Sequence, residues 1–281
     1  MEQLPRLQAR ISSLQELRDL VRALRALAAS HVQEAQGALA GMRRYAEVLE
    51  DAIAEGAGLL PETDGLAASS RHSDAGVLIV VCSEQGFAGA FNRRLLDRAV
   101  AERKAGQGFV ILGRRGAMLA AERGLEADRS FPMATHVGGV LSVTRQVAGY
   151  LAAVSKADVV FGGYRRGGNF EPEARSILPL DPALLVGSGR RSPPLHHLAP
   201  DTLLQRLASE YLFAEITRAV MESLASENGA RLRVMETADH NIGDKLKGLR
   251  RSENALRQEA ITSELLDLVT GSEAILGARG R

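Results

Sequence analysis

The segment best suited to carry chemistry is the polar turn from Ser83 to Asn92, which directly follows the apolar run 77–81. Ligands of α/β proteins bind beyond the carboxyl ends of strands, so a site is expected here. Its glycines, Gly86 and Gly89, give the spacing G-x-x-G and not the G-x-G-x-x-G of a dinucleotide-binding loop, and the sequence has no G-x-x-x-x-G-K-[ST]. We therefore interpret the turn as a tight connection in which the glycines permit close helix-to-strand packing and Asn92 caps the next helix.

The cysteine and the histidines offer no catalytic or metal-binding set. Cys82, the one cysteine, ends the apolar run, so we expect a small buried hydrophobic residue and not a nucleophile. No two of the six histidines have the i, i+4 spacing of a zinc-binding H-E-x-x-H, and no G-x-S-x-G elbow occurs. We expect no catalytic residue, no metal and no cofactor, which indicates a mechanical or scaffolding component.

A second polar arrangement lies near the carboxyl end of the chain. Residues 226–231 read Ser-Glu-Asn-Gly-Ala-Arg, and residues 254–262 place Arg257, Gln258 and Thr262 beside an apolar seam. Arg257 carries a permanently charged planar group that suits carboxylates on a partner, and Gln258 can both donate and accept hydrogen bonds. The alternative is an ordinary solvated helix face.

The composition favours long helices and argues against several kinds of partner. Of the 281 residues, 45% are hydrophobic and only 4% are aromatic, with no Trp. Paired helices can pack on Leu, Ala and Met alone, whereas a compact core normally uses large rings. The 35 basic and 34 acidic residues give a net charge of +1, so no overall field recruits nucleic acid or an acidic membrane surface.

The sequence also predicts where the protein resides. Charged residues interrupt the first 30 positions, so no signal peptide is expected, and no stretch reaches the roughly 18 apolar residues of a transmembrane span. A single cysteine fits a reducing compartment. We expect no transmembrane segment, so that any link to a membrane runs through a partner.

The positions of the prolines predict two long helices. All nine prolines lie outside residues 6–60 and 201–281, and both tracts carry apolar residues at helical spacing. Met235, Ile242 and Leu249 recur every seven residues, as in a coiled-coil seam. We predict that the two ends pair as antiparallel helices, with bending or interruption at their interior glycines. The alternative is a compact bundle.

The middle of the chain predicts an α/β domain with right-handed crossovers, because short apolar runs alternate with helical spacing. We expect strands at 77–81, 109–112 and 158–161, helices at 92–104, 117–123 and 140–156, and antiparallel edge strands within 174–186. The predicted fold class is α/β: a long antiparallel coiled coil of the N- and C-terminal helices plus a central Rossmann-like domain. The predicted domains are 1–55 and 201–281, which pair, and 76–187 between them.

Motifs along the whole chain resemble those of one family. The turn 83–92 is similar to the pattern S-D-R-G-L-C-G-G-F-N, and the first helix carries Arg10-Ile11-x-Ser13 and Ala28-Ala29. The most specific match is Ser226-Glu227-Asn228 followed by Asn254-x-x-Arg257-Gln258-x-x-Ile261-Thr262-x-Glu264-Leu265. In these residues, and in their order, the sequence resembles the gamma subunit of the F-type ATP synthase.

Several positions depart from the family's pattern. The segment 16–24 replaces a T-x-x-I-T-x-A-M run, Glu84 and Gln85 stand for Asp and Arg, and Ala88 stands for Cys. These departures suggest a divergent subtype, such as that of an alternative, sodium-linked ATPase.

The resemblance implies a central rotor shaft that is not an enzyme by itself. The paired helices would run inside a ring of alpha and beta subunits, and the α/β domain would sit on the membrane c-ring with the epsilon subunit. One copy per complex is implied, at the cytoplasmic face of the bacterial inner membrane as a peripheral subunit. Ion transport through the c-ring would turn the shaft and drive ATP synthesis.

The resemblance also implies contact residues. Arg257, Gln258 and Thr262 would contact a loop of the beta subunit. An apolar bearing would be formed by Leu4, Leu7, Ile11, Ile261, Leu265 and Leu268. Two alternatives remain open at this point: a nucleotide-binding α/β enzyme with helical arms, and a coiled-coil adaptor unrelated to ATPases.

Overall fold

The protein is described by a computed structural model that covers residues 3–59, 76–185 and 195–278. The chain forms two compact units. One comprises Met1–Ala26 with Met235–Arg281, and the other comprises Leu27–Val234. Two long helices, α1 (Gln3–Ala57) and α5 (Pro200–Ala278), contribute to both units.

The long helices coincide closely with the proline-free tracts. Pro200 is the first residue of α5, a position where the missing N–H of proline breaks no helical hydrogen bond. Neither helix is interrupted at its interior glycines, so the expected interruption was wrong. A glycine costs a helix only about 1 kcal/mol relative to alanine, which pairing along a long seam can outweigh.

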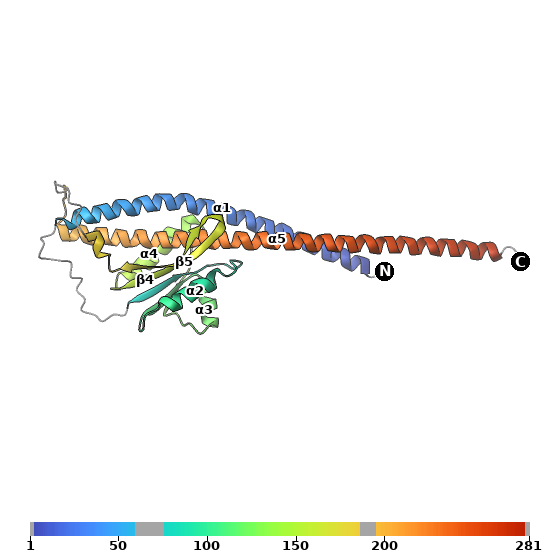
Figure 1. The fold of residues 1–281 in the computed structure, drawn as a ribbon, viewed down its shortest axis with the longest axis horizontal. Coiled ribbons are helices and arrows are strands. Elements are labelled where there is room, and N and C mark those ends of the chain that lie inside the picture. Colours follow the sequence, from blue (N-terminus) through green and yellow to red (C-terminus); the bar gives the residue numbers. More distant parts are fainter. Residues whose placement is uncertain (1–2, 60–75, 186–194, 279–281) are drawn as a thin grey trace. The chain divides into compact units, whose positions relative to one another are not determined.

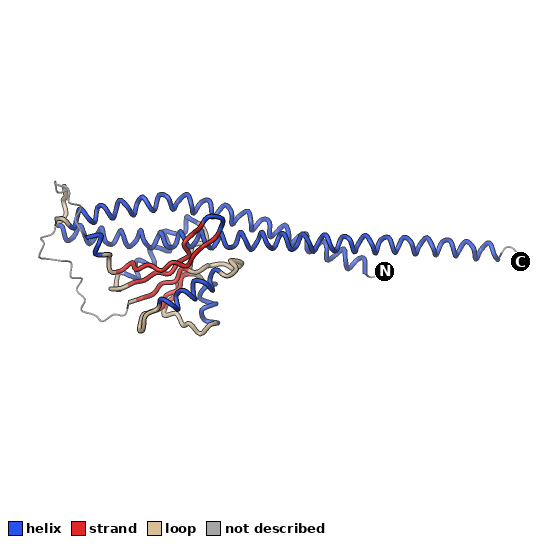
Figure 2. Tube along the Cα trace, viewed as in Figure 1, coloured by secondary structure: helices blue, strands red, loops and turns tan. Residues whose placement is uncertain are grey.

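The unit Leu27–Val234 is built on a five-stranded sheet with the order β3-β2-β1-β4-β5. Figure 2 shows its strands in red. Only β5 is antiparallel to its neighbour. The strands are β1 (Val77–Val81), β2 (Gly108–Leu112), β3 (Arg129–Phe131), β4 (Ala157–Arg165) and β5 (Asn169–Leu178). The connecting helices are α2 (Phe91–Glu102), α3 (Arg114–Glu122) and α4 (Val140–Leu151). This is the predicted Rossmann-like alternation of strands and helices.

Alternate residues of β1 face opposite sides of the sheet, and each side has its own core. Val77 and Ile79 belong to a cluster with residues of α4, α1 and α5, including Val220 and Leu224. Leu78 belongs to a second cluster with residues of α2 and α3. Figure 1 shows α2 and α3 on the side of the sheet away from α5. A strand buried on both faces reads as a continuous apolar run, which is why β1 was predictable.

In this unit, α1 and α5 run antiparallel. The Tyr45 hydroxyl donates to Glu210 at 2.5 Å, and the Tyr211 hydroxyl donates to Glu50 at 3.2 Å. The carboxylate of Glu210 accepts this bond and raises the pKa of Tyr45 to about 12.

The other unit is a pair of antiparallel helical segments. Gln8 of α1 donates to Glu253 of α5 at 3.1 Å, and Arg18 donates to Asp239 at 2.7 Å. Ile11 and Met235 are buried in the same unit. The predicted fold class, an α/β domain with a long antiparallel pair of terminal helices, is confirmed.

Two sheet elements differ from the sequence-based expectation. β3 was not predicted, because it has only three residues and two of them are exposed. β5 begins at Asn169, earlier than the expected edge segment 174–186, and includes Pro172. An edge strand tolerates proline because it has a free side that needs no N–H.

Within residues 3–59, 76–185 and 195–278, no helix is both long enough and apolar enough to cross a membrane. The division into domains 1–55, 76–187 and 201–281 stays a prediction, and its residues 1–2, 186–187 and 279–281 lie outside the described part.

Candidate functional site

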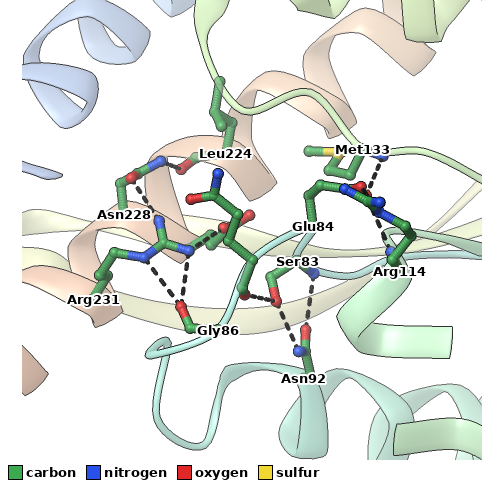
Figure 3. Close-up of polar contacts among 11 residues, drawn as sticks. Ser83, Glu84, Gly86, Asn92, Arg114, Met133, Leu224, Asn228 and Arg231 are labelled. Atoms are coloured by element: carbon green, nitrogen blue, oxygen red, sulfur yellow. Dashed lines mark hydrogen bonds and ion pairs between the residues drawn. The ribbon is translucent and has the colours of Figure 1, made fainter. Parts of the chain in front are cut away.

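The turn after β1 is held by a short network of hydrogen bonds (Figure 3). The Asn92 side chain accepts from the Ser83 N–H at 2.9 Å and donates to Ser83 Oγ at 2.8 Å. Ser83 Oγ in turn donates to the carbonyl of Gln85 at 2.9 Å. The helix cap of α2 is Ala90, so the prediction that Asn92 caps this helix was wrong. The amide of Asn92 is occupied by the turn and is not free for chemistry.

The two glycines of the turn differ in what they contribute. Gly89 has a φ of +59°, and a Cβ there would lie 3.1 Å from a methyl carbon of Val234 on α5. A Cβ on Gly86 would meet nothing within 4 Å. Gly89 therefore lets the turn lie close to α5, whereas the expectation of close packing at Gly86 was wrong.

Glu84 ties the end of β1 to the loops that follow the next two strands. Its Oε2 accepts from the backbone N–H groups of Met133 and Arg114, at 3.0 and 3.1 Å, and its Oε1 pairs with the Arg114 guanidinium. Burial alone would raise the pKa of Glu84, but these backbone N–H groups and the guanidinium outweigh it and lower the pKa. Glu84 is thus a structural carboxylate that stays ionised at neutral pH.

A buried ion pair on α5 reaches back to the same turn. Arg231 Nε and Nη2 donate to the carbonyl of Gly86, both at 3.2 Å, and Nη2 also donates to Glu227 at 2.5 Å (Figure 3). Arg231 Nη1 donates to the Asn228 side chain at 2.8 Å, and Asn228 donates to the carbonyl of Leu224 at 2.9 Å. The arginine therefore fixes the turn to α5 by two bonds at once.

The Glu227 carboxylate is buried and has a raised pKa. Its Oε2 is buried and has no hydrogen-bond partner among the described residues. Burial raises the pKa of Glu227 to about 7, although Arg231 acts in the opposite direction. Burial also raises the pKa of the Cys82 thiol, which is fully buried, as the sequence led us to expect.

A shallow hollow of about 330 Å³ opens beside the turn. Phe87 on its rim has a φ of 62° and is 70% exposed. Arg93 and Arg115 also line the hollow, but it contains no histidine, cysteine, aspartate or glutamate. A general base and a nucleophile are therefore missing from its lining, so the hollow does not have the make-up of an active site.

The predicted partner-binding residues lie on α5 in the unit with Met1–Ala26. Arg257 is exposed and pairs with Glu253 at 3.1 Å, and the same Glu253 oxygen accepts from Gln8. The Thr262 hydroxyl donates to the carbonyl of Gln258 at 2.8 Å, and both side chains are exposed. The three residues share a short exposed stretch of helix.

The six residues of the predicted bearing differ in their exposure. Ile11 is buried, Leu4 and Leu7 are half-buried, and Ile261, Leu265 and Leu268 are exposed. Ile11 therefore packs within the helix pair, whereas the three residues of α5 present apolar groups to the outside.

Sequence reasoning missed a cluster of charge in this unit. Asp239 of α5 lies 2.7 Å from Arg18, 3.1 Å from Arg22 and 3.8 Å from Arg25, all on α1. The hydrogen bond from Arg18 and the charges of Arg18 and Arg22 lower the pKa of Asp239. The i, i+4, i+7 spacing of the arginines was a readable signal, but their common acidic partner was not.

Comparison with known proteins gives the family. A family model described as ATP synthase matches residues 3–275. An ATP synthase gamma chain of Dinoroseobacter shibae is 30% identical over 312 residues, covering 98% of this chain and all of the relative. The chain belongs to the ATP synthase gamma-chain family. A further gamma chain, from Bdellovibrio bacteriovorus, is 27% identical over 300 residues and covers 99% of this chain.

Solved structures share the gamma-chain fold at low sequence identity. A chain of the mitochondrial ATP synthase of Euglena gracilis, in a structure titled OSCP/F1/c-ring, matches with a TM-score of 0.69 and 14% identity. That match covers 98% of this chain and 95% of the other. A chain from the structure titled rotor of the same enzyme matches with a TM-score of 0.64 and covers 92% of this chain and 98% of the other, also at 14% identity. The gamma-chain fold therefore persists where few residues are shared.

Proposed function

We propose that this gamma-family chain is the central rotor shaft of an F-type ATP synthase. The single observation that carries the proposal is the family match over residues 3–275, which includes both long helices and the α/β part between them. The titles of structurally similar chains support it, since they name a rotor, a central stalk with its c-ring, and an F1/c-ring assembly.

In this role the chain makes no bond to nucleotide. The shaft can change the conformational state of a catalytic subunit only if the contacts that the shaft makes differ between the states of that subunit. The differing flanks of the α1–α5 pair, with an arginine cluster around Asp239 and exposed leucines near the end of α5, supply such unequal contacts. Rotation then brings each catalytic subunit in turn against a different flank.

Arg257, Gln258 and Thr262 are proposed to contact a loop of the beta subunit. Glu253 already holds the Arg257 guanidinium in place, and the fork-shaped group keeps donors free for a second carboxylate. Truncating one partner of a buried charge pair at an interface costs about 2 to 5 kcal/mol. Removing the Arg257 guanidinium is expected to weaken the binding of the shaft to the beta subunit.

The bearing is proposed to consist of Leu4, Leu7, Ile11, Ile261, Leu265 and Leu268. Apolar contacts have no preferred direction, so they can support the shaft without favouring one rotation angle. Of these six residues, Ile261, Leu265 and Leu268 are exposed, so they are suited to direct contact with the surrounding ring of alpha and beta subunits.

The proposed partners are one set of alpha and beta subunits, the epsilon subunit and the membrane c-ring, with one copy of this chain per complex. The proposed location is the cytoplasmic face of the bacterial inner membrane, as a peripheral subunit. The departures at 16–24 and at Glu84, Gln85 and Ala88 support a divergent subtype, such as that of an alternative, sodium-linked ATPase.

Assembly and coupling test the proposal together. A tagged copy of this chain, co-expressed with the alpha and beta subunits of its own source, should purify with both. Arg257→Ala should then lower ATP synthesis while the complex still assembles, whereas Arg250→Ala, an exposed arginine of the same helix, should not. Unchanged coupling in Arg257→Ala would remove the assigned contact. Purification of the chain alone, or saturable binding of ATP or NAD to it, would favour the adaptor or the nucleotide-binding enzyme instead.

A further inference from the structure

Part of the contact between α5 and the sheet is apolar. Val220 and Leu224 are fully buried in the core that includes Ile79 of β1. Such contact is strong but has no preferred direction, so it does little to stop a helix from rolling about its own axis. A shaft that receives torque through the sheet needs directional contacts as well.

Two serines of α5 provide directional contacts with the main chain of the sheet. Ser223 Oγ donates to the carbonyl of Val81 at 2.6 Å and accepts from the N–H of Gly162 at 3.3 Å. Ser226 Oγ donates to the carbonyl of Gly162 at 2.7 Å. Both serines are buried, and together they bond to two neighbouring strands, β1 and β4.

Gly162 is suited to this contact in two ways. A Cβ there would lie 2.8 Å from the Phe91 ring and 3.0 Å from Cβ of Ser226, so only glycine allows the helix this close. The pairing of β1 with β4 ends at Val80 and Val160, and two residues further along β4 the N–H and carbonyl of Gly162 bond to the hydroxyls of Ser223 and Ser226.

Other serines of α5 behave differently. Ser209 and Ser252 are exposed and donate to carbonyls four residues earlier in the same helix, at Gln205 and Gly248. That is the usual way for a helical serine to satisfy its hydroxyl. The hydroxyls of Ser223 and Ser226 instead donate to carbonyls of the sheet, so these residues connect α5 to the sheet.

A backbone contact one turn further along fixes the same face of α5. Gly229 lies so close to Gly168 that a Cβ on Gly229 would be 2.9 Å from the Gly168 Cα. Ser226 and Gly229 are three residues apart, so they lie on one side of the helix. Contacts at successive turns define the rotational setting of α5 against the sheet.

We infer that Ser223 and Ser226 are positioning residues that fix the angle of α5 about its own axis, so that torque delivered to the α/β part passes into the shaft without slip. The inference rests on the proposed rotor function. The serines act by holding the helix, and they touch neither nucleotide nor a catalytic subunit in this role.

The test uses the assembled complex with the double variant Ser223→Ala/Ser226→Ala. The matched control is Ser209→Ala/Ser252→Ala, which removes two hydroxyls from the same helix without touching the sheet. A probe on the α/β part reports its angular fluctuation while the catalytic head is immobilised and stalled. Rates of ATP hydrolysis and ATP synthesis are measured in parallel.

The double variant should widen the angular variance about twofold and lower synthesis more than hydrolysis, because two directional bonds to the sheet are lost. The control should change neither quantity. Should the double variant fail to assemble, Ser223→Ala alone keeps the Ser226 bond and should give a smaller widening in the same direction. An angular variance equal to that of the control would overturn the inference. Failure of the unmodified chain to assemble with alpha and beta subunits would instead count against the proposed function.

Discussion

Arg231 donates two hydrogen bonds to one acceptor, the carbonyl oxygen of Gly86, from Nε and Nη2 at 3.2 Å each. The acceptor lies in the turn after β1, and the donor lies far along the chain on α5. The same guanidinium is paired with Glu227, so a buried charge and a turn are held by one side chain. The turn that seemed to offer a ligand site is therefore a structural anchor for the long helix.

Removing the Arg231 guanidinium should destabilise the protein strongly. Arg231→Ala leaves the Glu227 carboxylate buried and without its partner, which costs about 3 to 5 kcal/mol in comparable buried pairs. Arg250→Ala, at an exposed position of the same helix, should change the free energy of unfolding by less than about 0.5 kcal/mol. Urea unfolding of the full chain measures both. A loss in Arg231→Ala no larger than in Arg250→Ala would contradict the anchoring role.

Glu227 should make stability depend on pH in a specific window. Its pKa is raised from 4.5 to about 7 in the folded chain, so the folded state binds the proton more tightly than the unfolded state. The contribution of this group to the free energy of unfolding therefore falls as pH rises from 4.5 to about 7, and is constant above. The total loss is on the order of 3 kcal/mol.

Glu227→Gln cannot titrate and should lack this fall. Urea unfolding of both proteins at several pH values between 4.5 and 8 gives the comparison. Parallel pH profiles for the two proteins would show that Glu227 does not titrate in this window.

Glu84 should show the opposite dependence. Its pKa is lowered, so its contribution to stability is present above the unfolded value of 4.5 and is lost as pH falls through the folded pKa. Glu84→Gln should cost about 1 kcal/mol at pH 7, because a charged acceptor of three hydrogen bonds is replaced by a neutral one. Glu122→Gln, at an exposed site on α3, serves as the control. Thermal unfolding at pH 7 and at acid pH measures the difference, which should shrink on acidification.

Asp239 should stabilise the α1–α5 pair through charge. Asp239→Asn leaves Arg18, Arg22 and Arg25 close together without their common carboxylate, so the melting temperature should fall. The fall should be smaller at high salt, because salt screens repulsion between exposed charges. Asp19→Asn, at an exposed position on α1, should have little effect. Equal melting temperatures for the two variants at low salt would rule out the cluster as a stabilising feature.

The elements predicted best were those set by backbone rules and burial. The proline-free tracts predicted α1 and α5. The continuous apolar run predicted β1, which is buried on both faces of the sheet. The expected edge segment 174–186 begins later than β5, which starts at Asn169 and includes Pro172. An edge strand tolerates this proline, and only the sheet shows that β5 lies at an edge.

The candidate site was harder to predict than the fold. Asn92 carries a typical capping side chain, but the turn uses it to hold Ser83, and Ala90 caps the helix. Glu84 acquires its role from Arg114, and Glu227 acquires its role from Arg231. No local spacing in the sequence reveals that Glu84 pairs with Arg114. The i, i+4 spacing of Glu227 and Arg231 permits their pairing, but the sequence analysis did not predict it, and only the fold shows that the pair is buried.

Rotation of this chain inside an assembled head tests the central claim most directly. Cys82 is fully buried, so the exposed substitution Met118→Cys on α3 offers a single labelling site on the α/β part. With the beta subunits fixed to a surface and a bead attached at position 118, addition of ATP should turn the bead continuously in one direction. Rapid ATP hydrolysis by the same assembled complexes with a stationary or randomly moving bead would contradict the account.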